Sequence, residues 1–130
     1  MSLVIIESPY AGDIKANIAY ARRAVRDSLE RGEFPIASHL LYTQPGILND
    51  DIPSEREWGI RAGLAWRRVA DRAVFYLDRG WSNGMRAARD VYLAEQRPVE
   101  MRYLGAADPC DRFAADIGFT HDQIARLLGE

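Results

Sequence analysis

The sequence predicts an α/β domain built on a doubly wound parallel sheet of about four strands, and two features indicate it. Short apolar runs typical of buried strands alternate with longer stretches whose apolar residues recur every three or four positions. The most apolar run, residues 3–6, comes first, as expected of a central parallel strand buried on both faces. The 130 residues, 48% of them apolar, fit a single domain over 1–130 with its core in 3–104.

The first crossover is a helix between two strands. Apolar steps of three and four predict a helix that begins near Asp13 and ends at Gly32. Residues 34–37 form a short second strand. Because Pro35 lacks an N–H group, we expect this strand at a sheet edge, or the proline at a strand beginning.

A second helix and a third strand follow a polar loop. Ser54 and Glu57 have the spacing of a capping box, which predicts the helix start. The residues expected to form its buried stripe are Trp58, Ala62, Ala65 and Val69. Trp66 is likewise expected in the core, and residues 73–77 form the third strand.

The rest of the chain adds a loop, a helix and an edge strand. Residues 78–84 are too polar and glycine-rich to continue the third strand. A helix that ends before Pro98 buries Met85, Ala88, Val91 and Tyr92. The alternation over 99–103 indicates a half-exposed edge strand. In the C-terminal extension, residues 105–130, a short helix over 120–128 is expected, capped by Thr120 and Gln123.

Composition narrows the partners. Seventeen Lys and Arg against nineteen Asp and Glu leave no basic excess for a nucleic acid polymer or an anionic membrane. No apolar run could span a bilayer and no leader-like pattern opens the chain, so we expect a cytoplasmic protein. Cys110 cannot form an intramolecular disulfide and, with His39 and His121, offers no zinc-ligand spacing. We therefore expect no metal and no other cofactor.

The strand order locates a ligand site. Right-handed crossovers predict the order 2-1-3-4 with helices on both faces, so a crevice opens between the loops 8–13 and 78–84. Both loops contain glycine and lead into a helix N-terminus, which attracts an anion such as a phosphate. This predicts a phosphorylated or hydroxyl-rich small molecule, with Trp81 able to cover a base or sugar.

Each loop also has a purely structural interpretation. Gly12 and Gly84 can serve only to permit tight turns. The possible helix caps are Asp13, Ser82 and Asn83. Two such loops at one switch point favour binding over these alternatives.

The chain contains three short segments of interest: ESPYAGD at 7–13, followed by Asn17, then FPIASHL at 34–40 and SNGM at 82–85. In their order and spacing, these segments resemble the small phage and bacterial members of the nucleoside 2-deoxyribosyltransferase-like superfamily. The resemblance covers most of 3–104. It implies a flavodoxin-like fold that binds a nucleoside or nucleoside 5′-monophosphate and attacks the N-glycosidic bond, usually as an oligomer. The resemblance and the switch point together give the candidate ligand-binding residues Ser8, Tyr10, Gly12, Asp13, His39, Trp81, Ser82, Asn83, Gly84 and Met85.

The chain departs from that family at one position. The resemblance implies a glutamate four residues after the glycine of the second loop, where this chain has Ala88. Cleavage of the bond builds positive charge on the sugar, so a nearby carboxylate lowers the barrier. The acids that the two loops offer are Asp13 and Asp78, and His39 or Tyr10 could protonate the leaving base.

Three hypotheses follow. The first is an enzyme that acts on the glycosidic bond with a rearranged acid set, and the second is a nucleotide-binding or sensing homologue without catalysis. The third is a purely structural oligomer. Pro35 and residues 99–103 leave sheet edges that favour a homodimer or larger assembly.

Overall fold

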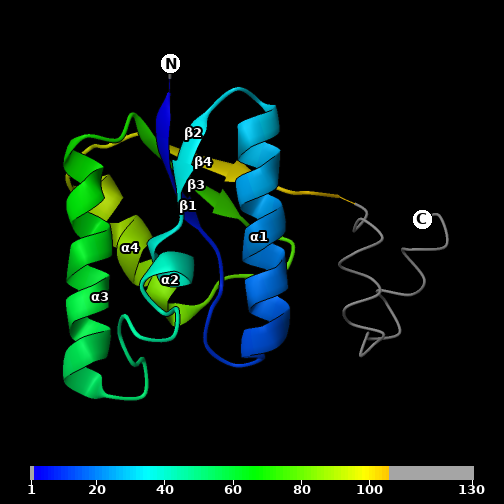
Figure 1. Ribbon diagram of the computed structural model, residues 1–130. Coiled ribbons are helices and arrows are strands. Elements are labelled where there is room, and N and C mark those ends of the chain that lie inside the picture. Colours follow the sequence, from blue (N-terminus) through cyan, green and yellow to red (C-terminus); the bar gives the residue numbers. More distant parts are fainter. Residues whose placement is uncertain (1, 106–130) are drawn as a thin grey trace, which may run out of the picture.

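The computed structural model describes residues 2–105, which form a four-stranded parallel sheet between two layers of helices (Figure 1). The elements in chain order are β1 (Leu3–Glu7), α1 (Ile14–Glu30), β2 (Phe34–Ile36), α2 (Ser38–Leu41), α3 (Pro53–Ala65), the 3-10 helix η1 (Trp66–Arg68), β3 (Arg72–Tyr76), α4 (Asn83–Ala94) and β4 (Val99–Arg102). All strand pairs are parallel and their order is β2-β1-β3-β4. The predicted doubly wound sheet is confirmed, and its topology is that of a flavodoxin-like fold.

The helices cover both faces of the sheet, as predicted. In Figure 1, α1 lies to the right of the sheet, and α3 and α4 lie to its left. Tyr20 and Ala24 of α1 are buried against alternate residues of β1 and β3. Met85, Ala88 and Tyr92 of α4 are buried on the other face, as predicted, whereas Val91 of the predicted inward stripe is half-buried.

The helix α3 begins and packs differently from the prediction. Ile52 is the N-cap and Pro53 the first helical residue, so the predicted capping box of Ser54 and Glu57 is wrong. A proline fits the first position because the N–H that it lacks would have no partner there. The carboxylate of Glu55 instead accepts a hydrogen bond of 2.8 Å from the N–H of Asn49.

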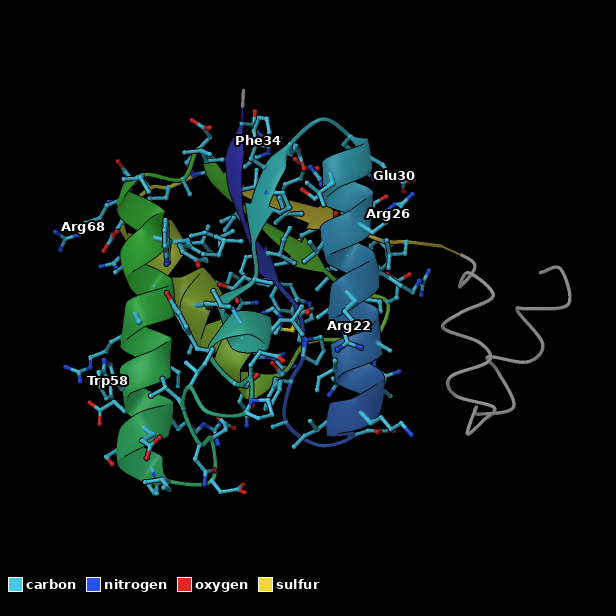
Figure 2. All side chains as sticks on the ribbon, in the orientation of Figure 1. Arg22, Arg26, Glu30, Phe34, Trp58 and Arg68 are labelled. Atoms are coloured by element: carbon cyan, nitrogen blue, oxygen red, sulfur yellow. The ribbon has the colours of Figure 1, made fainter. Side chains whose placement is uncertain are left out.

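The predicted buried stripe of α3 is also wrong. Trp58 and Val69 are each 59% exposed, Trp66 is 41% exposed and Ala65 is exposed too. Figure 2 shows Trp58 projecting from α3 away from the sheet. The helix presents Gly63 to its neighbours instead, because small residues allow the backbone to approach closely.

Gly63 contacts the short helix α2, which the sequence did not predict. A Cβ atom on Gly63 would lie 2.2 Å from Oγ and 2.9 Å from Cβ of Ser38, closer than packed atoms approach. The side of α3 that carries Gly63 therefore packs closely against α2, and this close packing depends on the absence of a side chain at residue 63.

We expect Gly63→Ala to lower the free energy of unfolding by about 1–3 kcal/mol, because the added methyl group overpacks the contact with Ser38. Urea unfolding measures the change. The double variant Gly63→Ala/Ser38→Gly should recover part of the loss, whereas a single variant as stable as the wild type would contradict this packing.

A buried charge cluster stabilises the α1 side of the sheet. Arg102 and Glu33 are 5% and 6% exposed, and two hydrogen bonds of 2.8 and 2.6 Å join the guanidinium to the carboxylate. Glu33 also accepts from Ser28, at 2.7 Å, and from Arg72. Arg102 is the main reason that the pKa of Glu33 falls to about 2. The cluster ties β4 to the chain segment that precedes β2.

The two edges of the sheet are β2 and β4, as predicted. Phe34 on one edge is 52% exposed, and Tyr103, just after the other, is 65% exposed. The predicted helix over 120–128, Cys110 and His121 lie outside the described residues. Within residues 2–105, no helix is long and apolar enough to cross a membrane. Self-association through the edges stays a prediction.

Candidate functional site

The structure brings the two predicted loops together at the carboxyl edge of the sheet. The side-chain amide of Asn17, in the first turns of α1, donates to the carbonyl oxygens of Tyr10 and Ala11, each at 3.0 Å. From the loop after β3, Nε of Arg79 donates to Oδ1 of Asn17 at 2.8 Å. Asn17 therefore connects both sides of the crevice at which the winding of the sheet reverses.

Both helices that begin at this crevice are capped by side chains. Asp13 Oδ1 accepts from the N–H of Ala16 at 3.2 Å, and Ser82 Oγ accepts from the N–H of Met85 at 3.2 Å. Asp13 and Ser82 are therefore the N-caps of α1 and α4, which is the structural role that the sequence offered as an alternative to binding. Their side chains satisfy N–H groups in the first turn of each helix. Asn83, the first residue of α4, is exposed.

The two candidate glycines differ. Gly12 has φ +96°, a left-handed conformation that favours glycine, so the turn itself requires it. Gly84 has no such conformation, and a Cβ atom there would meet only Ser82 Oγ, at 3.9 Å. The turn geometry therefore does not explain why residue 84 is glycine. Because Gly84 has no side chain, the backbone at the N-terminus of α4 is left uncovered there.

Asp78 is held in a structural arrangement. Its Oδ1 accepts from the hydroxyl of Tyr20 at 2.5 Å and from the N–H of Leu104 at 2.8 Å, and its Oδ2 accepts from the N–H of Gly105 at 3.1 Å. Burial and the Asp78 carboxylate raise the pKa of Tyr20, which stays protonated and donates. Both oxygens of Asp78 are thus engaged in fastening the segment after β4.

His39 and Ser8 form a second pair at this edge. Ser8 is buried, and its Oγ shares a hydrogen bond of 2.7 Å with Nε2 of His39. Burial lowers the pKa of His39 to about 4, so the imidazole is uncharged at neutral pH. A neutral imidazole is a weak proton donor, and the geometry favours a role in positioning α2 beside the first loop.

A cavity of about 520 Å³ lies beside the first loop, on the β2 side of β1. Its lining residues are Tyr10, Ile14, Thr43, Pro45, Gly46, Ile47, Leu48, Asn49, Asp50, Asp51 and Glu55. Tyr10 alone of the candidate ligand-binding residues belongs to this lining. The three acidic side chains disfavour a phosphate there and suit hydroxyl or amino groups.

Aromatic side chains pack together on the α4 side of the sheet, where Phe75 and Tyr92 are buried in the core. The rings of Phe75 and Trp81 lie 5.2 Å apart, and those of Phe75 and Tyr92 lie 6.0 Å apart. The guanidinium of Arg89 lies 4.9 Å from the ring of Trp81. Trp81 keeps part of its surface exposed.

Glu7 is the residue that sequence reasoning missed. It ends β1, and the hydroxyl of Tyr92 donates to its Oε2 at 2.6 Å. Burial raises the pKa of Glu7 to about 7, against the smaller opposite effect of that hydrogen bond. Ala88 lies one helical turn before Tyr92 and is 7% exposed. A carboxyl that can change protonation state near neutral pH is thus placed at the crevice.

No group of three metal-ligating side chains comes together in the part of the chain that the structure describes.

Comparisons with other proteins give a family but no activity. No curated protein and no solved structure matches the chain. The model of one family, a domain of unknown function (DUF7768), matches residues 2–104. That match covers most of the 130 residues, so the chain belongs to the DUF7768 family.

Proposed function

We propose that this protein binds a nucleoside or nucleoside 5′-monophosphate in the crevice between β1 and β3, and acts on its N-glycosidic bond. The position of Arg79 carries the proposal. This exposed cation is bonded to Asn17 near the N-terminus of α1, and it lies three residues before Ser82, the N-cap of α4. The N-terminus of α4, with open backbone at Gly84, and a guanidinium at the same crevice favour a phosphate.

The remaining parts of a nucleotide also have suitable neighbours. Trp81 offers a partly exposed ring against which a base can pack, and Tyr10, from the opposite loop, lines the acidic cavity. The carboxylates of that cavity are acceptors for sugar hydroxyls or base amino groups. The resemblance of segments 7–13, 34–40 and 82–85 to the nucleoside 2-deoxyribosyltransferase-like superfamily supports a nucleoside over other phosphorylated ligands.

Ala88 favours a second candidate function, that of a binding or sensing protein without catalysis. Its methyl group is buried with Met85 and Tyr92, so this position supplies no carboxylate to the sugar. Asp78 is engaged in hydrogen bonds to the segment after β4, and Asp13 caps α1. Catalysis therefore needs a carboxyl group from another position.

We expect the protein to bind a nucleoside 5′-monophosphate about 10–100-fold more tightly than the corresponding nucleoside, because charge-assisted hydrogen bonds contribute about 1.5–3 kcal/mol. Isothermal titration calorimetry with matched pairs of ligands measures the difference. Gly84→Leu should abolish this preference without loss of thermal stability, because the turn does not require glycine there.

Gly12→Ala is the control for a glycine that its turn does require. Because Gly12 has φ +96°, we expect this substitution to lower thermal stability. Equal affinity for phosphorylated and unphosphorylated ligands would remove the phosphate site from the proposal. A Gly84→Leu variant with the same affinities as the wild type would show that the ligand does not contact the N-terminus of α4.

A further inference from the structure

We infer that Glu7 is the catalytic acid of this crevice, and that it supplies from β1 the carboxyl group that Ala88 cannot supply from α4. The inference rests on the proposed function, because a glycosidic bond must be presented to the carboxyl for it to act. It concerns a residue that neither composition nor the two loops singled out.

The position of Glu7 follows from strand register and helix geometry. Glu7 pairs with Phe75 in the parallel ladder of β1 and β3, at the carboxyl ends of the two central strands. Ligands of open α/β sheets bind outside these ends, at the switch point. Its hydrogen bond to Tyr92 brings the carboxyl to α4, one turn from Ala88 on the same side of that helix.

The surroundings of Glu7, which is half-buried, differ from those of the buried carboxyl of Glu33. Two guanidinium groups, from Arg102 and Arg72, hold Glu33 in its ionised form. The partner of Glu7 is a hydroxyl, that of Tyr92, whose own pKa burial raises, so Tyr92 remains a neutral donor. A carboxyl held by a neutral donor in an apolar site can release and recover a proton, as acid catalysis requires.

An aromatic row leads from this carboxyl to the surface, with Phe75 and Tyr92 buried and Trp81 partly exposed at its outer end. Tyr92 contacts Phe75, and Phe75 contacts Trp81, which is partly exposed at the rim and carries Arg89 against its ring. A base placed against Trp81 would lie beside the carboxyl ends of β1 and β3, where the half-buried Glu7 lies.

The step that we assign to Glu7 balances with water as the co-reactant. The protonated carboxyl donates its proton to the departing base while the C1′–N bond breaks and its electron pair passes to the base. Water then adds to C1′ and gives a proton to the Glu7 carboxylate, which restores the acid. The products are the free base and the sugar phosphate.

The test is base release from a panel of nucleoside 5′-monophosphates, followed by chromatography, with binding of each ligand measured by calorimetry on the same full-length samples. We expect Glu7→Gln to lower the rate at least about 100-fold while it changes affinity less than about 3-fold, because general acid catalysis contributes about 10²–10⁴-fold. Glu57→Gln, the same substitution at an exposed position of α3, is the matched control and should leave both quantities unchanged.

Each outcome decides a different point. Glu7→Gln protein that binds and releases base as fast as wild type overturns the role of Glu7 and leaves the proposed function intact. Wild-type protein that binds but releases no base overturns the role of Glu7 and supports the non-catalytic alternative. Wild-type protein that binds no member of the panel overturns the proposed function and this inference with it.

A second variant keeps the test decisive if Glu7→Gln does not fold. Glu7→Asp retains the carboxyl but withdraws it by one methylene group from Tyr92 and from the ligand. We expect slower base release at nearly unchanged affinity, because proton transfer depends steeply on distance. A Glu7→Asp variant with the full wild-type rate would contradict direct proton transfer from this side chain.

Discussion

Arg102→Met is expected to lower the free energy of unfolding by about 3 kcal/mol at pH 7, because it removes the more buried of the two guanidinium partners of the Glu33 carboxylate. Glu33 would lose both hydrogen bonds from Arg102, at 2.8 and 2.6 Å, and keep Arg72 and Ser28 as partners. Tyr76 would also lose its contact of 3.0 Å with the guanidinium. Urea unfolding followed by circular dichroism measures the change.

The pH dependence of stability provides an independent check on the same pair. The pKa of Glu33 is lowered from 4.5 to about 2, so its stabilisation is present above pH 4.5 and is lost as the pH falls towards 2. That loss should be about 3 kcal/mol in the wild type and smaller in Arg102→Met. The double variant Glu33→Gln/Arg102→Met should be more stable than Arg102→Met alone. A single variant within about 1 kcal/mol of wild type would contradict the proposed importance of the pair.

Glu7→Gln is expected to stabilise the protein by about 2–3 kcal/mol at pH 8 and to have little effect at pH 4. Burial raises the pKa of Glu7 from 4.5 to about 7, so the wild type has its full stability below pH 4.5 and loses part of it as the pH rises through 7. Glutamine resembles the protonated acid and can still accept the hydrogen bond from Tyr92.

Thermal unfolding of both proteins between pH 4 and pH 8 measures this difference. The groups that act on the carboxyl are Tyr92 of α4, through its hydroxyl, and Arg67 of η1, which acts on Tyr92. Glu57→Gln should leave the pH profile unchanged, because that side chain is exposed. Parallel stability curves for wild type and Glu7→Gln would mean that Glu7 ionises as an ordinary exposed glutamate does.

Much of the fold could be predicted because its strands are apolar runs and its helix α4 has regular spacing. Met85, Ala88 and Tyr92 recur at three and four residues, and all three are buried. The pattern failed for α3, whose contact side carries Gly63 in place of large apolar residues. A hydrophobic pattern selects large side chains, so it assigned Trp58 to the core, although it is exposed. The four residues of α2 are too few for any helical pattern to register.

The candidate site could be predicted only in outline. Loop positions follow from strand order, and the structure joins the two loops through Asn17 and Arg79. The roles of single carboxyls depend on residues far along the chain. Asp78 is engaged by the N–H groups of Leu104 and Gly105, and Glu7 by Tyr92, 85 residues later. One local signal was available for Glu7: a charged residue directly follows four apolar residues at the end of the central strand.

Amide chemical-shift mapping with a nucleoside 5′-monophosphate tests directly whether the crevice between β1 and β3 is a nucleotide site. We expect the ligand to perturb residues 10–17 and 79–85, which meet through Asn17 and Arg79, together with the indole N–H of Trp81. The backbone amide signal of Glu7 should shift as well, since this residue lies at the same edge of the sheet. Perturbations confined to residues 43–55, around the acidic cavity, or no perturbation at saturating ligand, would contradict the assignment of nucleotide binding to this crevice.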